Sequence, residues 1–252
     1  MTNIEIHPKV DPKVVVITGA GTGIGAATAE LLAAQGHSVV LAARRRARLD
    51  EVAQTIRAGG GTVATHVADV AQYDDVQRLV DATVDQFGRL DVLVSNAGVA
   101  KIGPLADGDL RGWSEMIDVN LRGVLHGIAA AMPVFRRQGA GHFVTTLSTS
   151  GIKIVPNQGV YAATKNAVRT LLEALRQENT DGVVRTTGIS PGMVSTELTD
   201  SMDNPELRAQ TRATMADFGI PPAAVARAVA FAISQPPDVE IGDITIRPTL
   251  QG

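Results

Sequence analysis

The sequence contains no cysteine, and only 3% of its residues are aromatic. The absence of cysteine excludes a disulfide framework, a thiol nucleophile, and zinc or iron–sulfur sites built on Cys ligands. No apolar run approaches the roughly 18 residues that a membrane-spanning helix needs. Residues 1–13 show no basic-then-apolar leader pattern. These absences lead us to expect a soluble cytoplasmic protein that does not act at a membrane.

Charge of neither sign is in large excess, since 23 Lys and Arg face 26 Asp and Glu for a net charge of −3. This balance argues against an electrostatic nucleic-acid binder. None of the histidines stands at a metal-ligand spacing, so we interpret all five as structural and expect no metal: His7, His37, His66, His126 and His142. The 44% hydrophobic content is too high for a disordered chain.

Short β-branched runs alternate with longer helix-like segments along the whole chain. We expect strands over 13–18, 37–43, 62–68, 90–95, 142–148, 184–190 and 243–248. The intervening helices are expected near 24–36, 47–58, 72–87, 110–137, 160–178 and 221–234. This alternation predicts a single α/β domain over 1–252, doubly wound and Rossmann-like, in which helices cover both faces of a seven-stranded parallel sheet.

The helix expected over 110–137 carries an apolar stripe and an internal proline. Pro133 should bend or end it. The stripe consists of Ile117, Leu121, Val124, Leu125, Ile128 and Met132.

Residues 193–218 depart from the alternation, because they are polar and contain Asn204-Pro205. We interpret this segment as a substrate lid, with an ordinary surface loop carrying a short helix as the alternative. Arg208 and Arg212, one helical turn apart, would meet an acidic substrate or, as we favour, form a solvated face. Apolar lining for a pocket is expected from Val155, Met193, Leu198 and Met202.

A glycine-rich turn follows the first expected strand and opens the first helix. It reads Thr18-Gly19-Ala20-Gly21-Thr22-Gly23-Ile24-Gly25. Glycines allow a phosphate to approach the backbone, and a helix N-terminus offers free N–H groups. We therefore predict pyrophosphate contacts at this turn, the alternative being a merely structural tight turn. The residues expected to contribute are Gly19, Gly21, Thr22, Gly23, Ile24 and Gly25.

The end of the second strand bears on which dinucleotide would bind. No carboxylate stands there to accept the ribose 2′-OH of NAD, and Ala43 is followed by four arginines in five residues. Guanidinium groups match the oxygens of a 2′-phosphate, so the pattern predicts NADP(H). We expect Arg44 to contact the phosphate, helped by Arg45 or Arg48. Asp69-Val70 and Asn96-Ala97-Gly98 follow the third and fourth strands, where turn chemistry and ligand contact are equally good explanations.

Tyr161 and Lys165 are four residues apart on an expected helix, and Ser148 ends the fifth strand. A phenol with a pKa of about 10 must be shifted by about 3 units to exchange protons near neutrality. One ammonium at about 4 Å supplies about 4 kcal/mol at an effective dielectric of 20, which is enough. These residues therefore form a candidate acid–base site, the alternative for the Tyr–Lys pair being a solvated helix face.

Taken together, these motifs resemble the short-chain dehydrogenase/reductase family over essentially the full length. The matching segments are Thr18–Gly25, Asn96-Ala97-Gly98-Val99, Asn120, Ser148, Tyr161-x-x-x-Lys165 and Pro191-Gly192-Met193-Val194-Ser195-Thr196. One departure is that Leu147 precedes the expected serine where many relatives carry a second serine. The spacing still selects Ser148 over Ser150.

The resemblance implies a role for each matched residue. Tyr161 would be the general acid or base, Ser148 would polarise the carbonyl, and Lys165 would bind the nicotinamide ribose and lower the pKa of Tyr161. Asn120 would hold a water in a proton relay, although a capping or packing role is the alternative. Asp69 and Val70 would meet the adenine, Asn96 with Ala97 and Gly98 would lie near the ribose, and the nicotinamide would be bordered by Pro191, Gly192, Val194 and Thr196.

We therefore expect an NADP(H)-dependent oxidoreductase that interconverts a ketone or aldehyde and an alcohol. The alternatives are a 3-oxoacyl thioester reductase of lipid or polyketide synthesis and a non-catalytic NADP-binding sensor. The family resemblance also implies a homotetramer or homodimer with contacts through 110–137, 160–178 and 243–248.

Overall fold

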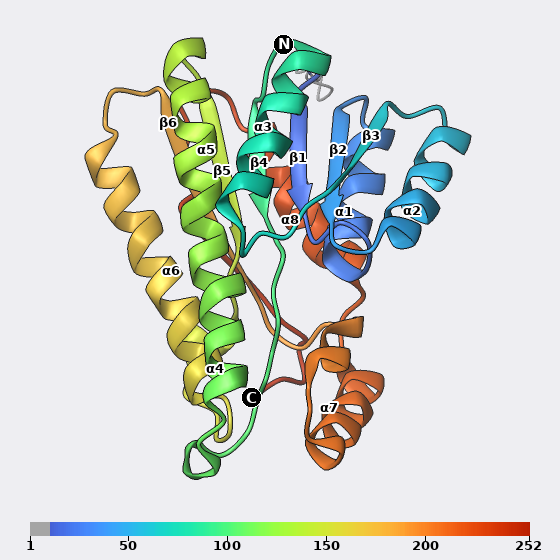
Figure 1. Ribbon diagram of the computed structural model, residues 1–252, viewed down its shortest axis with the longest axis vertical. Helices are drawn as coiled ribbons and strands as arrows, with labels where there is room; N and C mark the ends of the chain where they lie inside the picture. The colour runs from blue at the N-terminus through green and yellow to red at the C-terminus, as the bar shows by residue number, and fades with distance from the viewer. Residues whose placement is uncertain (1–10) are drawn as a thin grey trace, which may run out of the picture.

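Seven parallel strands form one sheet in the computed structural model, which describes residues 11–252 (Figure 1). Residues 1–10, with His7 and most of the segment searched for a leader, lie outside the described residues. The strand order is β3-β2-β1-β4-β5-β6-β7, as a doubly wound fold requires. The strands are β1 (Val14–Thr18), β2 (Ser38–Ala43), β3 (Val63–Val67), β4 (Val92–Ser95), β5 (Gly141–Thr146), β6 (Val184–Pro191) and β7 (Asp243–Ile246). The predicted fold class is confirmed.

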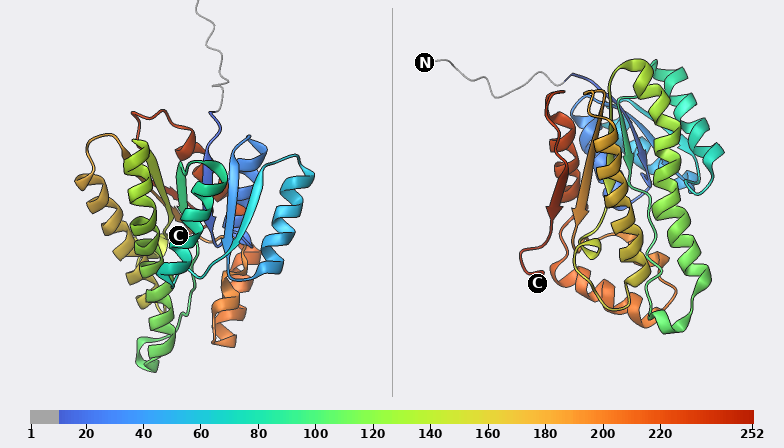
Figure 2. Two further views of the ribbon diagram at one scale, coloured as in Figure 1. Left: turned by 45° about the horizontal axis from the view of Figure 1, so that its top comes forward. Right: turned by 90° about the vertical axis from the view of Figure 1, so that its left-hand side faces the viewer.

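Helices cover both faces of this sheet (Figure 2). One layer contains α3 (Tyr73–Phe87), α5 (Gly123–Gln138) and α6 (Gly159–Glu178), and the other contains α1 (Gly23–Ala34), α2 (Arg46–Ala58) and α8 (Pro222–Ser234). Because side chains alternate along a strand, Val16 of β1 joins one core while Val15 and Ile17 join the other. Among the described residues, no helix combines the length and apolar content that crossing a membrane requires.

The single helix expected over 110–137 is interrupted. The chain forms α4 (Leu110–Ile117), then one wide π turn over Asp118–Arg122, and only then α5. The helix does not end at Pro133, because α5 continues to Gln138 and stops at Gly139, whose φ is +73°. Burial of the α5 face against the sheet explains this, since tertiary packing outweighs a lost helical hydrogen bond. That face comprises Val124, Gly127, Ala130, Ala131, Val134 and Phe135.

The apolar stripe that the sequence suggests on this helix matches its buried face only in part, since Val124 is buried and Leu121, Ile128 and Met132 are partly buried against the core. Ile117 and Leu125 are 37% and 41% exposed. The buried face is instead rich in small residues, and a Cβ added at Gly127 would lie 2.9 Å from the side chain of Leu93 on β4. Close approach to the sheet therefore selects small side chains, which a search for large apolar residues overlooks.

Residues 193–218 are mostly helical and lie beyond the carboxyl ends of the strands (Figure 1). A short 3-10 helix, η4 (Glu197–Ser201), is followed by α7 (Pro205–Phe218). Asn204 begins α7, because its Oδ1 accepts hydrogen bonds from the backbone N–H groups of Glu206 at 3.0 Å and Leu207 at 3.1 Å. The Asn-Pro pair is thus a helix start, and neither an irregular loop nor a very short helix describes this segment.

Candidate functional site

A cleft of about 980 Å³ lies at the carboxyl edge of the sheet. It includes the point between β1 and β4 where the strand order reverses, which is the usual ligand position in open α/β sheets. The cleft brings together all of the sequence-predicted site residues except Gly25 and Asn120, which lie behind its surface. The expected apolar residues line it as well: Val155, Met193, Leu198 and Met202.

The glycine-rich turn presents unpartnered amides to this cleft. Gly19 and Gly23 have φ values of +65° and +56°, which only glycine adopts readily. Thr22 is the N-cap of α1, yet its side chain makes no capping hydrogen bond to any described residue. The first N–H groups of α1 and the positive end of its dipole are therefore available for an anion.

Asn96 and Gly25 support the turn from behind. The Asn96 Nδ2 donates to the Thr18 carbonyl at 3.0 Å and the Gly19 carbonyl at 3.3 Å, and its Oδ1 accepts from the Thr146 hydroxyl at 3.1 Å. A Cβ at Gly25 would lie 2.3 Å from the Gly19 carbonyl oxygen, so only glycine fits there. Both residues thus have a structural reason to be present, whether or not a ligand binds.

Ser148, Tyr161 and Lys165 are buried around one part of the cleft. Their exposed fractions are 8%, 9% and 6%. Ser148 follows β5 and accepts a hydrogen bond from the Ser150 N–H at 3.1 Å. Tyr161 and Lys165 lie one turn apart on α6, with the Lys165 Nζ 5.9 Å from the centre of the Tyr161 ring.

Burial dominates the titration of both α6 residues. The Lys165 Nζ donates to the Thr146 carbonyl at 2.8 Å, and burial lowers the pKa of Lys165 to about 8. Burial also raises the pKa of Tyr161, while its hydrogen bond with Ser148 acts in the opposite direction. Burial, the larger of these two effects, therefore sets the direction of the Tyr161 pKa shift, and the expectation that Lys165 lowers this pKa stays a prediction.

Asn120 stands in the π turn and holds two neighbouring segments. Its Oδ1 accepts from the Val99 N–H at 2.9 Å, and its Nδ2 donates to the Val99 carbonyl at 2.9 Å and to the Thr164 hydroxyl at 3.2 Å. The side chain therefore fastens the segment after β4 and the middle of α6 to each other. These contacts fit the capping or packing role that the sequence left as an alternative, and the water-holding role stays a prediction.

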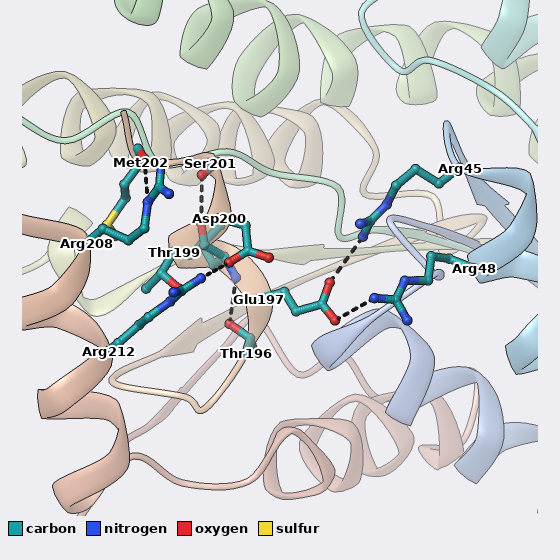
Figure 3. A network of polar contacts seen from close by, with 11 residues as sticks. Arg45, Arg48, Thr196, Glu197, Thr199, Asp200, Ser201, Met202, Arg208 and Arg212 are labelled. Carbon is teal, nitrogen blue, oxygen red and sulfur yellow. Dashed lines mark hydrogen bonds and ion pairs between the residues drawn. The ribbon is translucent and has the colours of Figure 1, made fainter. Parts of the chain in front are cut away.

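The arginines after β2 meet a partner that no motif predicted. Arg44 is exposed at the strand end, whereas Arg45 and Arg48 both contact the Glu197 carboxylate of η4, at 3.3 Å and 3.4 Å (Figure 3). Glu197 is separated from them by about 150 positions along the chain, so spacing alone gives no signal.

Arg208 and Arg212 make their contacts within the 193–218 segment itself. The Arg208 Nε donates to the Met202 carbonyl at 2.9 Å, and Arg212 contacts the Thr199 hydroxyl at 3.2 Å and the Asp200 carboxylate at 2.5 Å (Figure 3). Both guanidinium groups therefore tie α7 to η4. The sequence did not predict these contacts, but the Arg212 side chain is 55% exposed, as the favoured interpretation of a solvated face expects.

Two further features border the site without having been predicted. The Gln251 Oε1 accepts from the Met193 N–H at 2.8 Å, and its Nε2 donates to the Thr149 hydroxyl at 3.4 Å, so the end of the chain forms part of the cleft wall. A side pocket of about 130 Å³ lies at the start of α7, lined partly by Trp113, Asp203 and Asn204. Within the described residues, no group of three potential metal ligands occurs.

Comparisons with known proteins agree with this geometry. The family model described as short chain dehydrogenase matches residues 13–207. An uncharacterized oxidoreductase of Listeria monocytogenes is 42% identical over 95% of this chain and 97% of its own length. One from Staphylococcus saprophyticus is 41% identical over 96% of this chain and 98% of its own.

Solved structures resemble the whole chain. An alcohol dehydrogenase from Thermococcus sibiricus, complexed with 5-hydroxy-NADP, has a TM-score of 0.85 and 31% identity, covering 96% of this chain and 99% of that one. A short chain dehydrogenase/reductase from Burkholderia phymatum in complex with NAD has a TM-score of 0.87 and 30% identity, covering 95% of this chain and 90% of that one. The similarity therefore extends over both the sheet and the cleft.

Proposed function

Because this chain belongs to the short-chain dehydrogenase family and is an oxidoreductase, we propose that it interconverts a ketone or aldehyde and an alcohol with NADP(H). One observation carries the proposal: Ser148, Tyr161 and Lys165 are buried together in the same cleft that the uncapped start of α1 faces. A proton-exchanging group and an anion site in one cleft are the two parts that nicotinamide chemistry requires.

The residues of the cleft fit such a cofactor. The amides of Gly21 to Gly25 would hold the pyrophosphate. Asp69 and Val70 would contact the adenine side, with Asn96 to Gly98 beneath it. Lys165 and the segment Pro191–Thr196 would contact the nicotinamide side. NADP(H) rather than NAD(H) is favoured by Ala43, since β2 ends without a carboxylate. Arg44 and Arg45 would bind the 2′-phosphate. The Thermococcus sibiricus neighbour was crystallised with an NADP derivative, and the Burkholderia phymatum neighbour with NAD.

In the proposed reaction the cofactor supplies or accepts the hydride at the carbonyl carbon. The Tyr161 hydroxyl donates its proton to the carbonyl oxygen in reduction and accepts it back in oxidation. Burial raises the pKa of Tyr161, so the phenol is protonated near neutral pH, as a general acid must be. The Ser148 hydroxyl would orient the same oxygen, and Lys165 would add positive charge beside the phenol. Asn120 would place a water that returns the proton from solvent through Lys165.

Replacing Tyr161 by Phe tests this proposal. NADPH consumption over aliphatic, aryl and 3-oxoacyl thioester carbonyls should lose about 10²- to 10⁴-fold in kcat/KM, since only the proton donor is removed. The dissociation constant of NADPH should stay within about threefold of the wild-type value, because the phenol is not a phosphate contact. Tyr73→Phe is the matched control, since Tyr73 is the other tyrosine and is 42% exposed on α3.

Two results would contradict the proposal. Undiminished turnover in Tyr161→Phe would remove the phenol from the mechanism. Tight NADPH binding without turnover on any carbonyl or alcohol of the panel would favour the sensor alternative. A preference for 3-oxoacyl thioesters over simple ketones would assign the enzyme to the thioester reductases instead.

We also infer an assembly of two or four subunits. Apolar side chains are exposed on the helices that the family resemblance assigns to subunit contacts, notably Leu110, Ile117 and Leu125 of α4 and α5. Exposed large apolar side chains on these helices support the inference. Sedimentation at micromolar concentration measures it directly.

A further inference from the structure

Glu197 places a carboxylate between two of the arginines that the proposed cofactor would need. Its Oε2 lies 3.3 Å from the Arg45 Nη2, and its Oε1 lies 3.4 Å from the Arg48 Nη2 (Figure 3). Each oxygen thus serves a different guanidinium. The carboxylate and the two arginines are 40%, 59% and 41% exposed in their side chains, so the contacts are reachable by solvent and by ligand.

These contacts join two parts of the molecule that are otherwise separate. Glu197 opens η4, at the root of the segment that ends in α7, whereas Arg45 and Arg48 stand at the start of α2. The preceding residue, Thr196, lies directly over the glycine-rich turn, since a Cβ at Gly23 would be 3.2 Å from its Cγ2. The root of the lid therefore crosses the place where a pyrophosphate would lie and is fastened on the far side by Glu197.

Few other charged side chains lie near this bridge, and most of them already have an ion-pair partner. Arg48 also contacts Glu51 at 3.0 Å on its own helix, and Asp200 is paired with Arg212 within the lid. Arg44, exposed beside Arg45, has no ion pair with any described residue. Two carboxylates, Glu197 and Glu51, thus accompany Arg45 and Arg48, and Glu197 is the one that contacts both arginines. A phosphate monoester with about two negative charges would compete with Glu197 for them.

We propose that Glu197 is a displaceable internal anion that competes with the cofactor's 2′-phosphate. This inference rests on the proposed function for the identity of the ligand. Without a 2′-phosphate, Glu197 holds the lid root to α2 through Arg45 and Arg48. When a 2′-phosphate binds, it replaces Glu197 as the partner of these arginines and releases the lid root from α2. Glu197 therefore weakens binding of NADP(H) selectively, and NAD(H), which carries a hydroxyl at that position, leaves the bridge intact. Exposed ion pairs are weak enough for such an exchange.

Equilibrium binding to Glu197→Gln tests this. Calorimetry with the full chain would compare adenosine 2′,5′-bisphosphate with 5′-AMP, and NADPH with NADH. Glu197→Gln should tighten the two 2′-phosphorylated ligands about 3- to 10-fold, as expected for the loss of two exposed competing contacts. The other two ligands should change by less than about twofold. The gain should shrink in high salt, because the contacts are exposed.

Asp200→Asn is the matched control. It removes the same charge from the same short helix, but its partner, Arg212, lies within the lid, so the preference between the two ligand classes should not change. Glu197→Ala, which removes both the charge and most of the side chain, should shift the preference between the two ligand classes in the same direction as Glu197→Gln. Thermal melting of each variant shows that it is folded.

Three results would overturn the proposal. Weaker binding of both ligand classes would mean that Glu197 closes over the bound cofactor. Equal tightening of both, or no change in either, would mean that the carboxylate does not compete at the 2′ position. These outcomes are separate from failure of the proposed NADP(H) dependence, which a wild-type preference for NADH would show. In that case, the ratio of the variant's dissociation constant to the wild-type value, taken for each ligand, still tests the role of Glu197.

Discussion

The two sides of the cleft are built differently. The floor, defined here as the glycine-rich turn with Asn96, Asn120, Ser148, Tyr161 and Lys165, uses mostly buried polar groups bonded to backbone. The roof, defined as residues 193–218, uses more exposed ion pairs and a helix cap, and its longest helix, α7, buries only Met215. Losing a partner of a buried polar group costs about 1–3 kcal/mol, whereas an exposed ion pair contributes about 0–1 kcal/mol. The proposed acid–base residues thus stand on a fixed base, whereas the ion pairs proposed to respond to a 2′-phosphate are weak enough to be exchanged.

The largest expected effect lies in the floor. Gly25→Ala should destabilise the protein by about 3 kcal/mol or more, because the added Cβ would lie 2.3 Å from the Gly19 carbonyl oxygen, a backbone atom that cannot turn aside. Urea unfolding measures the loss. Gly242→Ala is the control, since nothing lies within 4 Å of a Cβ there. If both variants have the same free energy of unfolding, the floor accommodates the added methyl group more easily than its packing indicates.

A second test uses the buried ammonium of the floor. The pKa of Lys165 is about 8 in the folded protein, below its ordinary value of 10.5. The unfolded chain therefore binds more protons between these values, and the free energy of unfolding should rise with pH across that window. From pH 8 to pH 10 the rise should be about 2 kcal/mol relative to Lys165→Met.

Urea titrations of the two proteins at several pH values measure this difference. Lys153→Met, which removes an exposed ammonium, is the control and should follow the wild type. Parallel curves for wild type and Lys165→Met would contradict the prediction.

The smallest global effect is expected in the roof. Asn204→Ala removes the two cap hydrogen bonds of α7 and should cost that helix about 1 kcal/mol. Because α7 buries only Met215, hydrogen exchange should quicken over Pro205–Phe218 while the core strands stay protected. Asn204→Asp, which keeps the acceptor, should restore the slow exchange. Uniform quickening throughout the molecule would show that roof and floor unfold together.

Local patterns predicted the sheet well, for a physical reason. Runs such as 13–18 are apolar and β-branched, so the local sequence predicts the presence and approximate place of each strand, with bounds that differ by at most two residues. The cleft residues followed from the same logic, because carboxyl ends of parallel strands share one edge.

What local patterns did not predict depends on distant partners. The π turn contains Asn120, whose side chain bonds to Val99, 21 positions away. The bridge from Glu197 reaches Arg45 across 152 positions. Burial, which sets the direction of the Tyr161 pKa shift, is likewise a property of the whole packed molecule. Each of these effects needs three-dimensional proximity that spacing along the chain does not encode.

The side pocket at the start of α7 has a spectroscopic consequence. It is lined by Trp113, the only tryptophan of the sequence, together with Asp203 and Asn204 at the root of the roof. Indole emission shifts in colour and intensity when nearby charges or solvent move. The molecule therefore carries its own optical reporter at the start of α7, and we expect stopped-flow mixing with a dinucleotide to report any movement of the roof in real time without an attached dye.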